Sequence, residues 1–133
     1  MKEEEQSLKE MKIQLLTNEL QQIDELNKHC NVSFQYAKTY SSYVKDWENT
    51  KEQMLDQLNS GQLPPDTSPE FHKEVIKVID IVIKSKLEYA QKSFELKFGE
   101  SIFNYLGKDG KTKGCFGVIL FLIIFSGLIS IFV

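Results

Sequence analysis

The chain has 133 residues and a formal net charge of −3, from 16 basic and 19 acidic side chains. All the basic residues are lysines, so the guanidinium best suited to bidentate phosphate recognition is absent. Together with the negative net charge, this argues against nucleic-acid binding. The two cysteines, Cys30 and Cys115, are too few and too far apart for a disulfide framework or a CxxC metal site. Every charged residue lies between Lys2 and Lys113, which leaves the last 20 residues uncharged.

Residues 1–60 contain no glycine or proline and are rich in Glu, Lys, Gln and Leu, a composition that favours helix. Apolar residues recur at heptad spacing from Ile13, which predicts an acidic amphipathic arm of coiled-coil character. Later in the arm the apolar stripe shifts to a second set of residues, which indicates packing against a partner helix more than a long symmetrical coiled coil. This second set is Tyr40, Tyr43, Trp47 and Met54.

Residues 61–68 are predicted to form a turn that ends this arm. Gly61 suits a helix C-cap, and the pair Pro64 and Pro65 cannot continue a helix. We therefore expect the chain to reverse direction here.

A second amphipathic helix is predicted over residues 69–106. Ser68 suits its N-cap and Pro69 its first position. Residues 75–83 are rich in β-branched side chains, as in a strand, but polar residues recur within them at helical spacing. The apolar stripe then continues with a period of about 3.67 residues, so helix is the preferred prediction.

The two arms carry opposite charge, with a net −5 over residues 1–66 and a net +2 over residues 67–113. The pattern predicts an all-α protein in which the arms form a long antiparallel helical hairpin. The alternative is a three-helix bundle, in which the first arm breaks between His29 and Ser33 and is capped by Asn31 or Ser33. The residues expected to make helix–helix contacts are Leu16, Leu20, Ile23, Phe34, Ile76, Ile79, Ile83, Leu87 and Phe94.

Residues 114–133 are predicted to form a single C-terminal transmembrane helix. Fourteen of them are Ile, Leu, Val or Phe, and only Ser126 and Ser130 are polar. Twenty helical residues span about 30 Å, which matches the hydrocarbon core of a bilayer. Ser126, Gly127 and Ser130 form a small-residue pattern that could bring two such spans together.

Residues 107–113 form a lysine-rich juxtamembrane linker, in which Lys108, Lys111 and Lys113 outnumber a single acid. Positive charge beside a span stays on the cytoplasmic side, so we expect a tail-anchored, single-pass protein with a cytoplasmic N-terminus. In a eukaryote this layout favours the endoplasmic reticulum or secretory pathway, and in a bacterium the inner membrane. Cys115, at the predicted membrane edge, is a candidate for reversible lipidation.

No combination of nucleophile and base, phosphate-binding loop or metal-ligand set is evident, so the sequence predicts neither an enzyme nor a cofactor or small-molecule substrate. His29 and Cys30 are neighbours, and adjacent helical residues do not face each other. We expect a helical scaffold, adaptor or tether whose partners are the lipid bilayer and a helical protein or second copy of the chain. The alternatives are SNARE-like membrane fusion, although Pro64 and Pro65 interrupt the repeat, and a small membrane-active oligomerising effector.

Overall fold

The computed structural model describes residues 2–109. These residues form helices α1 (Lys2–His29), α2 (Ser33–Ser60), α3 (Pro69–Phe98) and α4 (Phe103–Asp109). No strand occurs among them, so the all-α prediction is confirmed for this part of the chain, including the β-branched run within α3.

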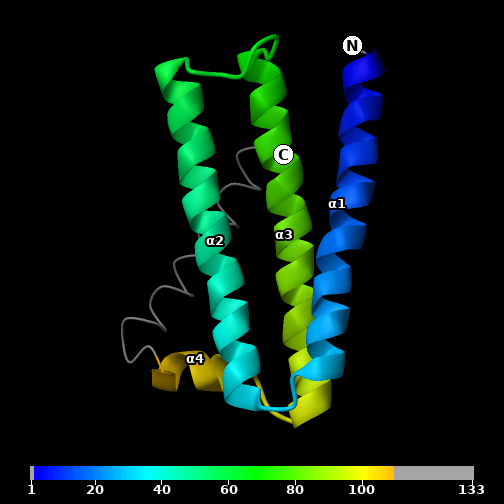
Figure 1. Ribbon diagram of the computed structural model, residues 1–133, viewed down its shortest axis with the longest axis vertical. Helices are drawn as coiled ribbons and strands as arrows, with labels where there is room; N and C mark the ends of the chain where they lie inside the picture. The colour runs from blue at the N-terminus through cyan, green and yellow to red at the C-terminus, as the bar shows by residue number, and fades with distance from the viewer. Residues whose placement is uncertain (1, 110–133) are drawn as a thin grey trace.

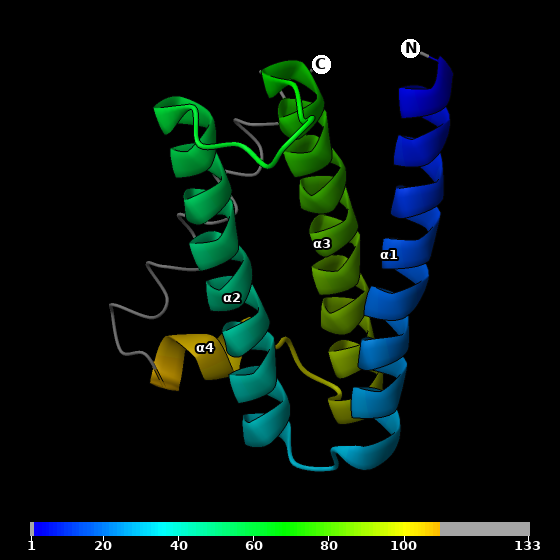
Figure 2. The same ribbon diagram turned by 45° about the horizontal axis from the view of Figure 1, so that its top comes forward.

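The three long helices lie side by side, with α3 between α1 and α2 and packed against both (Figure 1 and Figure 2). Helices α1 and α3 run in the same direction and α2 runs opposite to them. The end of the bundle where α1 ends, α2 begins and α3 ends is called the basal end. The opposite end is called the distal end. Helix α4 lies across the basal end and packs against α2.

The first arm is not one long helix, and the three-helix alternative describes the structure. Helix α1 ends at His29, and Val32 adopts an extended backbone, with φ −112° and ψ 116°, immediately before α2. Asn27 beside the break is held by two other helices, because its Oδ1 accepts from the Tyr36 hydroxyl at 2.6 Å and its carbonyl accepts from Lys97 Nζ. These tertiary contacts replace the glycine or proline that the sequence lacks at this turn.

The predicted caps Asn31 and Ser33 do not cap the break. The N-cap position of α2 is Val32, and no side chain caps it. The second turn follows the prediction closely: Gly61 ends α2 with φ 76°, and Ser68 Oγ accepts from the Phe71 amide at 3.1 Å. Both predicted caps of that turn are confirmed.

Helix α3 ends at Phe98 and does not continue to Leu106. Gly99 adopts φ 73°, a left-handed conformation that L-residues disfavour, and its amide donates to the Glu95 carbonyl at 2.8 Å. The chain therefore turns before α4, which lets Ile102 and Leu106 bury their side chains in the core.

The apolar core lies mainly in the basal half of the bundle. Its buried members are Ile23, Tyr36, Ala37, Tyr40, Val44, Trp47, Ile83, Leu87, Ala90, Phe94, Ile102 and Leu106. Among the described residues, Ile23 is the only buried residue of α1, and α2 has none beyond Trp47. In the distal half the buried side chains come from α3 and include His72, Ile76 and Asp80.

Candidate functional site

The residues predicted to make helix–helix contacts differ in their burial. Ile23, Ile76, Ile83, Leu87 and Phe94 are buried, Ile79 is partly buried against the core, and Leu16 and Leu20 are half-buried. Phe34 differs from the expectation, since 46% of its surface is exposed. It lies in the first turn of α2, where Tyr36 and Ala37 occupy the inward positions.

Aromatic side chains fill the basal core around Phe94. Its ring centroid lies 5.3 Å from Tyr36, 4.7 Å from Phe98 and 5.7 Å from Tyr105, with the Tyr36 and Tyr105 rings edge-on. Burial raises the pKa of the Tyr36 hydroxyl to about 12, since the phenolate would lose its hydration there. This cluster joins α2, α3 and α4.

Asp80 is a buried carboxylate on α3 that pairs with two side chains of α2. Its Oδ1 accepts from Trp47 Nε1 at 2.8 Å and from Lys51 Nζ at 3.1 Å. The sequence offered one signal for this site, an acid placed within the apolar run 75–83.

Lys86 is a buried ammonium that joins α3 to α1 and α2. It donates to Glu19 Oε2 at 2.6 Å and to Gln22 Oε1 at 2.8 Å, and its Nζ lies 3.7 Å from the centre of the Tyr43 ring. A carboxylate, an amide oxygen and an aromatic face together replace the water that this charge gives up on burial. Sequence reasoning missed this site.

His72 is buried in the first turn of α3, where the sequence indicated no partner for it. Its Nε2 lies 3.0 Å from the Met54 carbonyl oxygen, so Nε2 carries the proton and donates it. This contact joins the distal end of α3 to α2.

The polar side chains of the interior fix helix register. Among the described residues, every buried side-chain nitrogen and oxygen has a hydrogen-bond partner, and no group of three metal-ligating side chains comes together. Cys30 Sγ is partly buried and donates to the Val32 carbonyl at 3.4 Å, while exposed His29 pairs with Glu25 at 3.2 Å. His29 and Cys30 therefore contact different groups.

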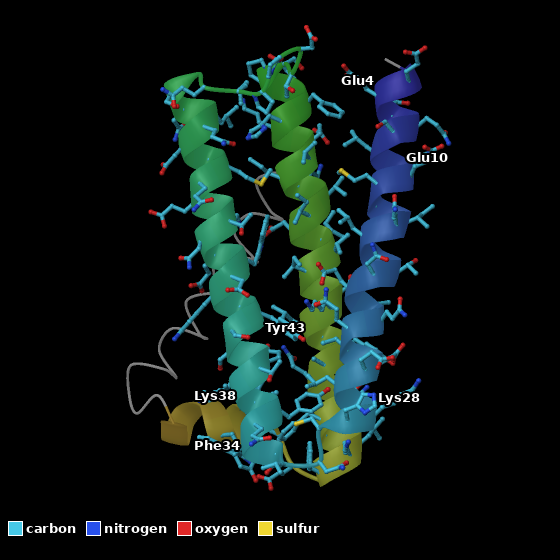
Figure 3. The ribbon with its side chains drawn as sticks, viewed as in Figure 1. Glu4, Glu10, Lys28, Phe34, Lys38 and Tyr43 are labelled. Carbon is cyan, nitrogen blue, oxygen red and sulfur yellow. The ribbon has the colours of Figure 1, made fainter. Side chains whose placement is uncertain are left out.

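The surface that stands out lies at the basal end. Large apolar side chains are exposed there, with Val32 at 51%, Phe34 at 46% and Leu96 at 88%. Lys28 and Lys38 are exposed, and Figure 3 places Lys28, Phe34 and Lys38 at this end. We call these five residues the basal surface.

Several predicted residues lie outside residues 2–109, where the structure is described. They are Lys111, Lys113, Cys115, Ser126, Gly127 and Ser130, together with the whole predicted span 114–133. Lys108 lies on α4, next to the start of that segment. Within residues 2–109, no helix combines the length and apolar character that a membrane crossing requires.

Comparison of the chain with protein-family models, with curated proteins and with solved structures gives no match.

Proposed function

We propose that this chain is a single-pass, membrane-attached helical adaptor that holds a protein partner near a membrane. The observation that carries the proposal is the uncharged segment 114–133, with fourteen Ile, Leu, Val or Phe residues directly after a lysine-rich linker. A segment of this length and composition favours insertion into a bilayer. Lys108, Lys111 and Lys113 favour a cytoplasmic bundle.

The distal end is the surface that the bundle offers to a partner. Residues 2–12 and 52–74, which form this end, contain four lysines and nine acids, a net −5. Helix α3 has 30 residues and is therefore about 45 Å long, so its distal end is well separated from its basal end. A partner with a basic surface is the electrostatic complement.

The fusion alternative is less well supported. A fusion helix needs a continuous zipper that leads toward the bilayer. Here Gly99 ends α3 well before the apolar segment, and the buried faces of α1, α2 and α3 already pack in one bundle.

The membrane claim is tested by fractionating cells that express the tagged full chain beside a version that ends at Lys113. We expect the full chain to stay in carbonate-washed membranes and the shortened version to be soluble. A third form with Leu122→Lys and Ile124→Lys keeps the length but breaks the apolar run, and it should also be soluble. A full chain found in the soluble fraction would refute membrane attachment.

The adaptor claim is tested by proximity labelling from an enzyme fused to the N-terminus of the full chain. Replacing Glu3, Glu4 and Glu5 by lysine should abolish labelling of the dominant neighbour, because the acidic distal end is lost. Replacing the basal residues Lys28 and Lys38 by glutamate serves as the control, and labelling should persist. Equal labelling by all three forms would contradict the assignment of the distal end.

A further inference from the structure

We infer that the basal end of the bundle docks onto the anionic surface of the membrane that holds segment 114–133. This inference rests on the proposed membrane attachment and adds an orientation to it, in which the helices stand on the bilayer with their distal ends pointing away. The binding partner is a lipid surface rich in acidic headgroups.

Charge is the first argument. Residues 25–38 and 92–109, which form the basal end, contain five lysines and four acids, a net +1, against −5 for the distal end. Lys111 and Lys113 follow in the sequence. A nearby anionic surface attracts juxtamembrane lysines and repels acids, and this effect fades within about 10 Å. The net charge of the bundle therefore changes from negative at the distal end to positive at the basal end. This favours contact between the basal end and an anionic membrane.

The availability of those lysines is the second argument. Within the described residues, Lys28 and Lys38 are exposed and take part in no hydrogen bond or ion pair. Two of the nearby acids already have partners, because Glu25 pairs with His29 and Glu100 accepts from Tyr105 at 3.0 Å.

Exposed apolar side chains are the third argument. Val32, Phe34 and Leu96 belong to three different segments, the α1–α2 turn, the start of α2 and the end of α3, yet all lie at the basal end. Apolar side chains beside lysines are the combination that enters the boundary between headgroups and acyl chains. Leu96, with 88% of its surface exposed, has the most apolar surface to remove from water.

Chain length is the fourth argument. Helix α4 ends at Asp109, and the uncharged segment begins at Gly114. Five residue steps cover at most about 18 Å, so α4 at the basal end must stay within that distance of the segment's first residue. The distal end is under no such constraint, because α3 alone is about 45 Å long.

The test measures energy transfer from a dye on the full chain to acceptor-labelled lipid headgroups in vesicles. Two cysteine positions on α2 serve as matched labels, Gln35→Cys near the basal end and Asn59→Cys near the distal end, each with Cys30→Ser and Cys115→Ser. Both native side chains are exposed, and 24 residues separate them by about 36 Å.

In vesicles that contain phosphatidylserine, we expect transfer from position 35 to exceed that from position 59 by roughly twofold or more. The difference should shrink in pure phosphatidylcholine and in the variant Lys28→Glu with Lys38→Glu. The control variant Lys9→Glu with Lys12→Glu changes the net charge equally at the distal end and should leave the difference intact. Circular dichroism confirms that each variant keeps its helices.

Equal energy transfer from both labels would overturn the docking proposal, because it would mean that the bundle lies flat on the membrane or rotates freely above it. A difference that responds neither to lipid charge nor to Lys28 and Lys38 would overturn the role of anionic lipid. Failure of the full chain to float with the vesicles is a separate result that refutes membrane attachment itself.

Discussion

The basal and distal halves of this bundle differ in how many apolar side chains they bury. The basal half buries a continuous set of apolar and aromatic side chains centred on Phe94. In the distal half fewer side chains are buried, Ile76 among them, and α2 also contacts α3 through polar pairs, Asp80 with Trp47 and Lys51, and His72 with the Met54 carbonyl.

Apolar burial and polar contacts contribute differently to a helix bundle. Apolar burial is the main source of stability, whereas satisfied polar contacts chiefly specify which helix faces meet. The basal half, next to the proposed membrane segment, is therefore the stable platform. The distal half buries fewer side chains, so we expect it to open locally more readily than the basal half.

The comparison is tested most severely by removing an aromatic ring from each half of α3. Phe94→Ala should lower the free energy of unfolding by about 3–5 kcal/mol, because it leaves a cavity in the fully buried basal cluster. Phe71→Ala, in the half-buried distal turn, should cost about 1–2 kcal/mol. Urea unfolding of the full chain in mild detergent, followed by circular dichroism, measures both, and equal losses would contradict the asymmetry.

Asp80→Ala tests the polar contacts. The variant removes the buried oxygen that the Trp47 indole and the Lys51 ammonium share as acceptor, so we expect a loss of about 3 kcal/mol. Asp56→Ala removes an exposed acid from the same half and should change stability by less than about 0.5 kcal/mol. The same unfolding measurement compares them, and a similar small effect for both would show that the buried pair is unimportant.

Alkaline pH should weaken the basal half through Tyr36. Folding raises the pKa of this tyrosine from 10.0 to about 12, so above pH 10 the unfolded chain ionises first and the native state loses stability up to about pH 12. At about pH 11 this amounts to about 1.4 kcal/mol. Tyr36→Phe should lose correspondingly less stability between about pH 9 and pH 11 than the unmodified chain. An identical drop in both would exclude Tyr36 as the source.

The start of α3 should show the smallest effect. Ser68→Ala removes the acceptor of the Phe71 amide and should cost about 1 kcal/mol. Thr67→Ala, one residue earlier, is the control and should stay within about 0.5 kcal/mol. Thermal unfolding of the two variants distinguishes a true cap from a general effect of the loop.

Local signals in the sequence predicted local structure well. The turn between α2 and α3 is marked by Gly61, Ser68 and Pro69, because each of these residues acts on backbone close to it in the sequence. Helical spacing also predicted the second apolar stripe of the first arm, where Tyr40 and Trp47 are now buried.

Features that depend on contacts between residues far apart in the sequence could not be predicted from the spacing of residues along one helix. The break after His29 could be predicted only as an alternative to one long helix, because no glycine or proline marks it. In the structure, contacts from α2 and α3 hold Asn27 beside the break. Gly99 could have indicated the end of α3, but the apolar period continues through Ile102 and concealed the turn.

The buried charges were hidden for the same reason. Lys86 shares a helix with many exposed lysines, and only its pairing with Glu19, 67 positions earlier, distinguishes it. Composition and spacing along one helix carry no information about that partner.

Hydrogen–deuterium exchange of the full chain in lipid nanodiscs measures the difference in stability between the basal and distal halves. Because the basal half buries more side chains than the distal half, we expect slow amide exchange for residues 36–47 and 83–94. Exchange should be much faster for residues 3–15 of the same bundle. Uniform protection along all three helices, or a distal half that exchanges more slowly than the basal half, would contradict it.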